Sequence, residues 1–175
     1  MDRQKEKLVQ ESKTIMTEMI MPNDTNPLGN LMGGNLMRWM DIAGGICAAK
    51  HCESHVVTAS VDHVSFQSPI KEGDVITLTA TVTRAFNTSV EIYVEVSAAD
   101  ITGGNARKSN HAYLTFVALG AESKKPISVP PLRPLTSEEL KLHESAIRRR
   151  ELRLILSGRM KPEEAVEIKD FFKDK

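Results

Sequence analysis

The spacing of hydrophobic and polar residues changes several times along the chain, and each change predicts a different element. Residues 13–21 alternate imperfectly between apolar and polar side chains, which predicts a first strand. Residues 22–28 follow with the run Pro-Asn-Asp-Thr-Asn-Pro, whose members favour turns, so the strand ends there. From residue 33 the apolar residues take the spacing of a helix, and from residue 56 they alternate again.

A long, mostly buried helix is predicted over residues 33–51. Apolar side chains recur there at three- and four-residue intervals, and polar residues recur every third position at Asn35, Arg38 and Asp41. A glycine inside a helix costs about 1 kcal/mol relative to alanine. The Gly-Gly pair in the middle of this segment is therefore expected to serve close packing of the helix against a sheet.

Four further strands are predicted after the helix. Residues 56–66, 74–86, 89–99 and 107–119 are rich in β-branched side chains and alternate with a period of two. The links between them have the lengths that join antiparallel neighbours. One strand, one long helix and four antiparallel strands define an α+β order, in which one curved five-stranded sheet wraps around a single helix.

Composition divides the chain into four segments. Residues 1–12 are a polar lead-in that is either loose or a short helix. Residues 13–120 form the core domain. Residues 121–135 carry four prolines and predict an extended connector, because proline removes a hydrogen-bond donor and biases its predecessor away from helix. Residues 136–175 predict a charged C-terminal helical extension.

In this extension, Thr136 or Ser137 can cap a helix that has two acids in its first turn. The Ser-Gly pair at 157–158 ends that helix, and residues 162–172 predict a second one with proline at its first position. The first helix also carries a basic cluster, which is either a solvated face, an intersubunit contact or a phosphate site: Arg148, Arg149, Arg150 and Arg153.

The 175 residues include 23 basic and 23 acidic side chains, so the formal net charge is zero. This balance argues against a nucleic-acid-binding protein, which carries a basic excess, and leaves the chain free to self-associate.

Cys47 and Cys52 lack the spacing of a zinc or redox motif and predict two reduced thiols. The charged N-terminus does not resemble a signal peptide, and no apolar stretch is long enough to span a membrane. The expected location is the cytoplasm, with no membrane partner.

Candidate chemistry gathers around the start of the long helix. The chain lacks a GxSxG nucleophile motif, and its histidines lack metal-ligand spacing. The glycines at 29–34 lack the spacing of a nucleotide-binding loop. No metal or cofactor is therefore expected. What remains is Asn26 in the loop, the pair Gly33 and Gly34 at the start of the helix, and Asp41 about two turns later.

Asp41 stands between Met40 and Ile42 on a helix committed to burial. It must be paired, hydrogen-bonded or catalytic, because burying an ionised carboxylate is costly. An ion pair with Arg38, three residues back on the same face, is the structural alternative. The two glycines favour a site, since bare N–H groups at a helix N-terminus can stabilise a developing oxyanion, and a cap alone needs only one glycine.

The run DTNPLGNLMGGNLMRWMDIAGG followed by VVTASVDHVSF resembles hot-dog fold acyl-CoA thioesterases of the cytosolic acyl-CoA hydrolase type. The resemblance covers residues 13–120. Its most specific part is N-x-x-G-x-x-x-G-G, with an acid seven residues after the second glycine. It implies the hot-dog fold, in which a five-stranded sheet wraps a central helix, and it places Asn26 and Asp41 at that family's catalytic positions.

The resemblance also implies an assembly. Hot-dog subunits pair edge to edge into a continuous sheet, so the chain is expected to be at least a dimer and commonly a trimer of dimers. Each active site then lies between two subunits, with Asn26 facing Asp41 of its neighbour. Coenzyme A is expected at the turn formed by Asn87, Thr88 and Ser89. The basic residues that hold its phosphates stay unassigned among several candidates: Arg84, Lys108 and the cluster that starts at Arg148.

The implied reaction is hydrolysis of acyl-CoA to a free fatty acid and coenzyme A, with no cofactor. A thiol with a pKa near 8.5 leaves readily, so one carboxylate and an oxyanion hole can suffice. Asp41 acts as general base on a water, or attacks the carbonyl directly to give an anhydride. The N–H of Gly34 stabilises the oxyanion, and Asn26 orients the water or the carbonyl.

Two other functions remain open from the sequence. The same fold can hydrate or dehydrate an acyl thioester, in which case His63 and His111 on the strands are the available proton-transfer pair. Alternatively, the domain senses acyl-CoA as a binding module, and the charged C-terminal helices recruit a partner.

Overall fold

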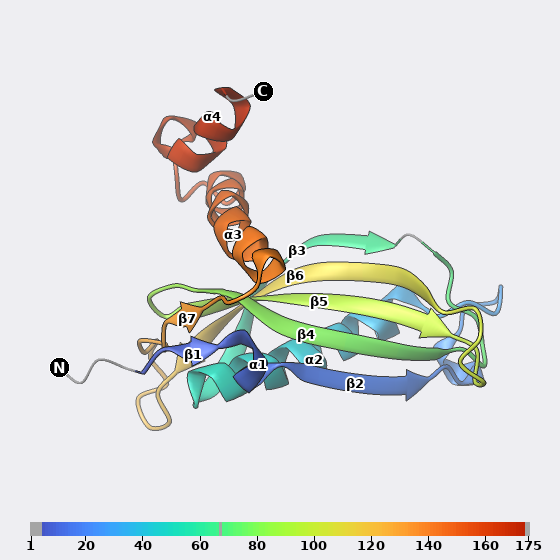
Figure 1. The fold of residues 1–175 in the computed structure, drawn as a ribbon. Helices are drawn as coiled ribbons and strands as arrows, with labels where there is room; N and C mark the ends of the chain where they lie inside the picture. The colour runs from blue at the N-terminus through green and yellow to red at the C-terminus, as the bar shows by residue number, and fades with distance from the viewer. Residues whose placement is uncertain (1–4, 67, 174–175) are drawn as a thin grey trace. The chain divides into compact units, whose positions relative to one another are not determined.

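A 20-residue helix, α2 (Gly33–Cys52), lies along a five-stranded antiparallel sheet and contacts all five of its strands (Figure 1). The structure is a computed structural model that describes residues 5–66 and 68–173. This arrangement confirms the predicted α+β class, with one sheet wrapped around one long helix. The strands of the sheet are β2 (Thr14–Met19), β3 (His55–Phe66), β4 (Val75–Ala85), β5 (Ser89–Ala99) and β6 (Arg107–Leu119).

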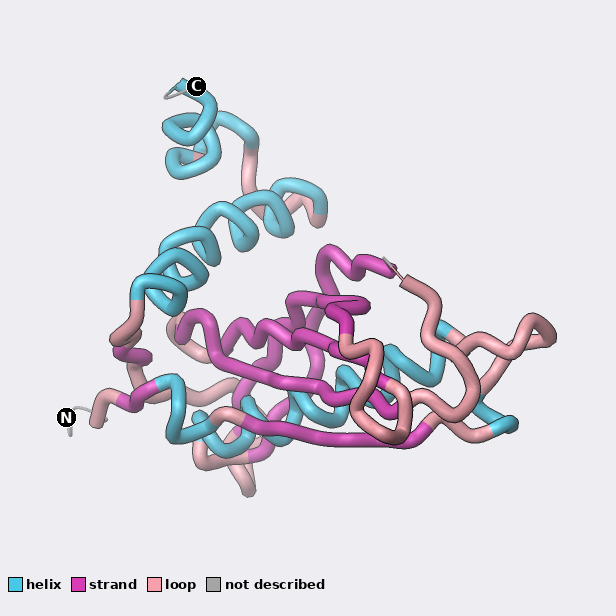
Figure 2. Tube along the Cα trace, turned by 45° about the vertical axis from the view of Figure 1, so that its right-hand side comes forward, coloured by secondary structure: helices cyan, strands magenta, loops and turns pink. Residues whose placement is uncertain are grey.

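The strands lie in the order β2-β4-β5-β6-β3, and every neighbouring pair is antiparallel. Short links join β4 to β5 and β5 to β6, as their lengths predict. Strands β2 and β3 flank α2 in the sequence and form the two edges of the sheet. The loop before α2 and the β3–β4 loop meet at the end of the sheet where α2 begins, since the N–H of Leu31 donates to the carbonyl of Ile70 (Figure 2).

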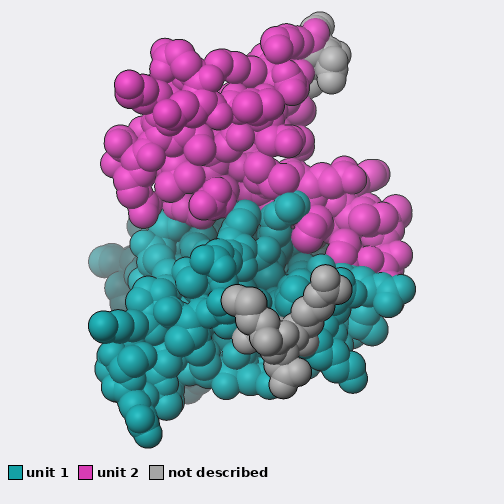
Figure 3. Space-filling view, turned by 90° about the vertical axis from the view of Figure 1, so that its left-hand side faces the viewer, with its two compact units in different colours: residues 1–133 teal, residues 134–175 magenta. Residues whose placement is uncertain are grey.

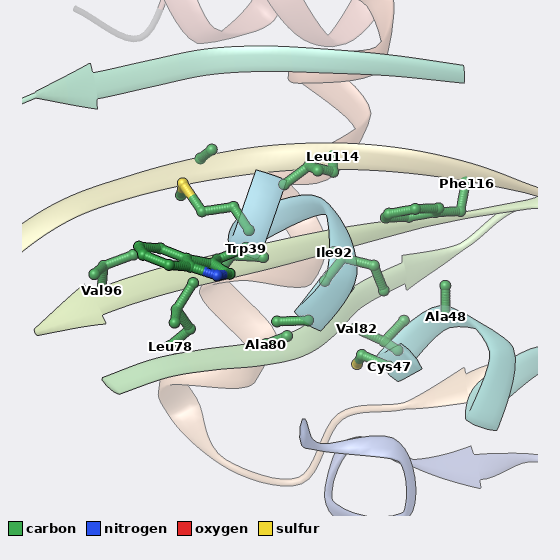
Figure 4. Close-up of a cluster of buried hydrophobic side chains, with 14 of the residues drawn as sticks. Trp39, Cys47, Ala48, Leu78, Ala80, Val82, Ile92, Val96, Leu114 and Phe116 are labelled. Carbon is green, nitrogen blue, oxygen red and sulfur yellow. The ribbon is translucent and has the colours of Figure 1, made fainter. Parts of the chain in front are cut away.

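The core lies between α2 and the three central strands (Figure 4). Alternate side chains of each strand point toward α2, and those of β5 from Val90 to Ala98 are almost fully buried. A Cβ atom on Gly44 would lie only 3.1 Å from the ring of Phe116. Glycine at this position therefore lets helix and sheet approach closely, which confirms the packing role expected for it.

The polar lead-in belongs to the fold of the first domain. Lys7–Leu8 forms a short strand, β1, which pairs in parallel with β7 (Leu132–Arg133), and Val9–Ser12 forms one helical turn, α1. The short helix predicted there is present, but the strand pair is not predictable from either segment alone. The connector is extended as its prolines indicate, and it packs onto the domain through Val129 and Leu132.

The chain forms two compact units, Met1–Arg133 and Pro134–Lys175 (Figure 3). The first unit therefore extends past the boundary at residue 120 that composition suggests, because β7 pairs with β1. The second unit holds α3 (Ser137–Leu156), the 3-10 turn Pro162–Glu164 and α4 (Val166–Lys173).

Within the second unit, Thr136 caps α3, and its side chain accepts a hydrogen bond from the N–H of Glu139, as the sequence predicts. The buried carboxylate of Glu151 accepts hydrogen bonds from the N–H groups of Glu167 and Ile168 at the start of α4. The second helix begins at Val166 rather than at residue 162, because the first residues of the predicted segment form the 3-10 turn.

None of the helices in the described part of the chain is long and apolar enough to cross a membrane. Cys47 and Cys52 are both free and buried in the core, as expected. Burial raises the pKa of the Cys47 thiol to about 12 and that of Cys52 to about 11, so both stay protonated at neutral pH.

His51 joins the last turn of α2 to the connector. Its ring is fully buried, and Nε2 lies 2.9 Å from the carbonyl oxygen of Pro130. The neutral ring can donate this hydrogen bond, whereas Nδ1 is buried without a partner among the described residues. Burial lowers the pKa of His51 below its usual 6.5, because a second proton would be placed on Nδ1 without an acceptor.

We expect this histidine to make the stability of the fold depend on pH. Below pH 6.5 the unfolded chain binds a proton that the folded chain does not, so the free energy of unfolding falls as the pH decreases toward the lowered pKa. The slope from one such group is at most about 1.4 kcal/mol per pH unit. Urea unfolding of the wild type and of His51→Gln, followed by Trp39 fluorescence at pH 7.5 and 5.5, measures it. Equal pH dependence in both proteins would contradict this role.

Candidate active site

The loop that carries Asn26 is tied together by its own hydrogen bonds. The side-chain oxygen of Asn26 accepts from the N–H groups of Leu28, at 2.9 Å, and Asn30, at 3.2 Å. Its backbone N–H donates to the carbonyl of Asn30, and its carbonyl accepts from the N–H of Gly29. Within the described chain, the side-chain nitrogen of Asn26 has no partner, so its two N–H groups are the part of the side chain left for a ligand.

The same loop is fixed to the start of α2. The N–H of Met32 donates to the carbonyl of Asp24 at 2.9 Å, and the side chain of Asn35 donates to the carbonyl and carboxylate oxygens of Asp24. Gly33 and Gly34 begin the helix and are exposed. A Cβ atom on Gly34 would meet nothing within 4 Å, and the first N–H groups of a helix have no partner within the helix itself.

Asp41 lies on α2 beside the edge strand β3. One carboxylate oxygen accepts a hydrogen bond of 2.6 Å from the hydroxyl of Thr58, and the structure gives the other oxygen no partner among the described residues. The prediction that this carboxylate is buried is wrong for the single chain, where Asp41 is partly exposed because its side of α2 is not covered by the sheet. Arg38 forms no ion pair with it in the described structure, so that alternative is not realised.

Asp41 and Thr58 line an open hollow of about 400 Å3 between α2 and β3. The walls and floor are mostly apolar or small, and the far end holds Ser54 and His55. The hollow is lined by Asp41, Ile42, Gly45, Ile46, Ala49, Ser54, His55, Val56, Thr58 and Phe116. This is a carboxylate with one fixed and one available oxygen at the edge of a mainly apolar space.

The structure brings only some of the predicted site residues together within one chain. Asn26 and Gly34 both lie at the N-terminal end of α2. Asp41 follows Gly34 by seven residues, which places it about 10 Å further along the helix axis. The carboxylate and the N-terminal N–H groups of one helix therefore cannot both contact one carbonyl group directly.

The predicted coenzyme A residues lie elsewhere. Asn87, Thr88 and Ser89 form the turn between β4 and β5, where the carbonyl of Asn87 accepts from the N–H of Val129. None of the three lines the hollow that contains Asp41. Thr88 nevertheless lies near the His55 end of the hollow, since its carbonyl accepts from the N–H of Ala118, which pairs with the lining residue Val56.

The two strand histidines lie on the opposite side of the sheet from α2. The residues of β6 that face the helix are Ala112, Leu114 and Phe116, so His111 points away from it. The ring of His63 lies near that of His111, with 6.2 Å between centroids and a tilt of 41° between the planes. This pair is therefore remote from the hollow.

The basic candidates for phosphate binding are dispersed. Lys108 forms an ion pair with Glu95 at 2.8 Å. Arg148 lies over the ring of Phe171, and Arg149 donates to Ser145 and to the carbonyl of Leu142 in its own helix. Arg148, Arg149 and Arg150 point in successive directions around the helix, whereas Arg153 shares a face with Arg149 and Arg150.

A curved antiparallel sheet around one helix, with an acid on the helix and open N–H groups at its N-terminus, defines a hot-dog fold protein. Residues 28–104 match the family model described as thioesterase superfamily. A Bacillus subtilis protein named uncharacterized acyl-CoA thioester hydrolase YkhA is 38% identical over 149 residues, which cover 85% of this chain and 86% of that protein. The chain therefore belongs to the thioesterase superfamily, among the acyl-CoA hydrolases.

Solved structures agree with this assignment. An acyl-CoA hydrolase from Staphylococcus aureus, crystallised with butyryl coenzyme A and coenzyme A, has a TM-score of 0.80 and 37% identity, covering 87% of this chain and 94% of that one. A structure titled apo-hexameric acyl-CoA thioesterase has a TM-score of 0.84 and 38% identity, covering 87% of this chain and 97% of that one.

The Staphylococcus aureus enzyme was also solved as three variants in which an asparagine, an aspartate or a threonine is replaced by alanine. In that protein the aspartate follows the asparagine by 15 positions and the threonine follows the aspartate by 17. Asn26, Asp41 and Thr58 have the same separations in this chain.

Thr58 is the residue that the sequence analysis missed. It lies in the middle of a predicted strand, where threonine is common for its β propensity alone. A register shift of the β3–β6 pair between Thr58 and Ser60 leaves Thr58 on the helix side of the sheet and Ser60 on the other side. Such a shift has no local sequence signal, so only the folded chain reveals the contact with Asp41.

We expect Thr58→Val to lower kcat for acyl-CoA hydrolysis by about 10- to 100-fold, because a hydrogen bond to a charged group is worth about 1.5–3 kcal/mol. Valine fits the strand and removes only the hydroxyl that fixes the carboxylate. Steady-state kinetics should assign most of the loss to kcat rather than to KM. Thr58→Ser, which keeps the hydroxyl, is the matched control and should retain activity within a few fold. Equal losses in both variants would exclude the hydroxyl as the cause.

Proposed function

We propose that this protein hydrolyses acyl-CoA thioesters to a fatty acid and coenzyme A, with Asp41 as the base or nucleophile. The observation that carries the proposal is the geometry of the Asp41 carboxylate. One oxygen is held by Thr58 at 2.6 Å, while the other is available at the edge of a hollow large enough for a substrate group. Membership of the acyl-CoA hydrolases and the shared spacing with the Staphylococcus aureus variants support these residues.

In the general-base route, Asp41 accepts a proton from a water molecule as the water oxygen bonds to the carbonyl carbon. The carbon–sulfur bond then breaks, the thiolate of coenzyme A leaves, and the proton on Asp41 passes to it or to solvent. Direct attack by the carboxylate would give an anhydride that water then hydrolyses. Both routes need Asp41 ionised and fixed in position.

Asn26 acts as a hydrogen-bond donor in this proposal. Its side-chain oxygen is already used by the N–H groups of Leu28 and Asn30, so its side-chain nitrogen is the group available to substrate. A donor at this position stabilises the carbonyl oxygen as it becomes negative. The N–H of Gly34, at the positive end of the α2 dipole, supplies a second donor at the same end of the helix.

The complete site combines two subunits, with Asn26 and Gly34 from one copy and Asp41 from the other. The separation of about 10 Å along a single helix supports this division. Strand β3 is an exposed edge that carries apolar side chains, with Val57 48% and Val61 39% exposed, and a second copy would cover it. The hexameric relative supports a trimer of dimers.

Contacts to coenzyme A stay assigned to Asn87, Thr88 and Ser89 as a proposal. The alternative hydration or dehydration reaction is not supported, since His63 and His111 face away from Asp41. An acyl-CoA sensor would bind the substrate without releasing free thiol, so a thiol-release assay of the wild type distinguishes a sensor from a hydrolase.

We expect Asp41→Asn to lower kcat by about 10²- to 10⁴-fold while the fold and the oligomeric state persist, because the amide can neither accept the proton nor attack the carbonyl. Release of free thiol from acyl-CoA measures the reaction, and both protein thiols are buried and protonated. Asp170→Asn, an exposed acid of the second unit, is the control. Full activity in Asp41→Asn would refute the assignment of Asp41, and no turnover in the wild type would refute the hydrolase.

Mixed oligomers test the division of the site between subunits. Asn26→Asp keeps the oxygen that organises the loop but removes the donor, so it should lose about 10²- to 10³-fold in kcat. Co-expressed with Asp41→Asn in equal amounts, it forms mixed dimers about half of the time, and one of the two sites in each mixed dimer is intact. We therefore expect about a quarter of wild-type activity from two nearly inactive variants. If both residues act within one chain, activity stays at the mean of the two variants.

A further inference from the structure

The hollow between α2 and β3 extends well beyond Asp41, and the part beyond it has no role in the chemistry described above. We call this part the α2–β3 groove and define it by Gly45, Ala49, Val56, His55 and Phe116, which line the hollow together with Asp41. An inference about its occupant rests on the proposed hydrolase function, because that function places the thioester at one end of the groove.

The groove is straight and of limited length. Asp41, Gly45 and Ala49 are spaced by four residues, so they lie along one side of α2. Ala49 is eight residues beyond Asp41, or about 12 Å along the helix axis. With carbon–carbon bonds of about 1.5 Å, this is roughly the extended length of a chain of eight to ten carbons.

The small residues keep the groove open. A Cβ atom on Gly45 would lie 3.6 Å from the ring of Phe116, which is an ordinary contact, so the absence of a side chain is not required by the packing of the helix. At Gly44, one residue earlier, a Cβ atom would lie at a tighter 3.1 Å from the same ring, so the ring would have to shift. Gly45 therefore leaves space over Phe116 that the fold itself does not need.

The chemistry of the walls favours a hydrocarbon. Isoleucines at 42 and 46, with Val56 and Phe116, supply apolar surface along the length of the groove, and no described lysine or arginine lines it. The described polar side chains beyond Asp41 and Thr58 are confined to the far end, at Ser54 and His55. A phosphorylated nucleotide lacks a counter-charge here, and the amides of a pantetheine arm lack side-chain partners along the middle.

We propose that the α2–β3 groove holds the acyl chain of the substrate and that Gly45 and Ala49 set how long a chain is accepted. The carbonyl carbon lies at Asp41, the first carbons pass over Phe116 beside Gly45, and longer chains extend past Ala49 toward His55. Chains of up to about eight to ten carbons fill the groove, and further carbons extend beyond Ala49.

Two substitutions test this at different depths. Ala49→Leu fills the far part of the groove, so the ratio of kcat/KM for dodecanoyl-CoA to that for butanoyl-CoA should fall at least tenfold, at about fourfold per excluded methylene. In the same variant, the ratio of kcat/KM for octanoyl-CoA to that for butanoyl-CoA should fall less. Gly45→Ala narrows the part of the groove next to Asp41. It should lower kcat/KM for octanoyl-CoA and for dodecanoyl-CoA by the same factor relative to butanoyl-CoA. Ala121→Leu, at an exposed position in the turn after β6, is the matched control and should leave every ratio unchanged.

The outcomes separate the possible occupants. If the groove instead holds the pantetheine arm, both variants raise KM for all chain lengths equally and weaken inhibition by free coenzyme A, which would overturn the proposal. Unchanged ratios in both variants would also overturn it. Gly45→Ala keeps the test valid if Ala49→Leu fails to assemble, because the fold has room for its methyl group and alanine favours the helix. Absence of any hydrolysis by the wild type would refute the proposed function rather than the groove.

Discussion

The close packing of α2 against the sheet is the contact on which the rest of the structure depends. A single helix has to cover the inner side of five strands, and the ring of Phe116 approaches it at Gly44, where even a Cβ atom would lie within 3.1 Å of the ring. This approach fixes the rotation of the helix about its axis. The residues of α2 that face the central strands are buried in the core. Asp41 therefore lies at the boundary of the side of α2 that the sheet covers, next to Thr58 on the edge strand. The position of the carboxylate is thus a consequence of how the core packs.

The same rotation leaves apolar side chains on the uncovered side of α2 and along β3. Ile42, Ile46, Val57 and Val61 are each more than a third exposed in the single chain. Burying one such side chain fully is worth about 1.5–3 kcal/mol, so covering this region with a second copy is a substantial driving force for assembly. Ile42 and Ile46 line the hollow together with Asp41, so a second copy covering them would also exclude water from the carboxylate. In the proposed assembly, stability and chemistry therefore depend on the same interface.

Much of the fold follows from local pattern, and the exceptions share a physical cause. The alternation after residue 56 and the helical spacing after residue 33 are properties of neighbouring residues, so the five strands and the long helix were predictable. The pairing of Lys7 with Leu132 joins segments more than a hundred residues apart, which no local pattern encodes. The Asp41–Thr58 bond likewise joins a helix to an edge strand 17 residues later, a contact that no local pattern encodes. The exposure of Asp41 was misjudged because helical spacing shows that a side is apolar but not whether the chain's own sheet covers it.

Three hydrogen bonds that look structural would also prepare the proposed site for its chemistry. The side-chain oxygen of Asn26 accepts hydrogen bonds within the loop, and one oxygen of Asp41 accepts from Thr58. The side-chain nitrogen of Asn26 and the second oxygen of Asp41 are therefore left available, each in a fixed direction. Groups held in this way need no reorganisation when charge develops on the carbonyl oxygen. One helix cannot present both its N-terminus and a side chain two turns later to the same carbonyl. In the proposed site, the donors come from one helix and the acid from another, so association would be a geometric requirement of the reaction.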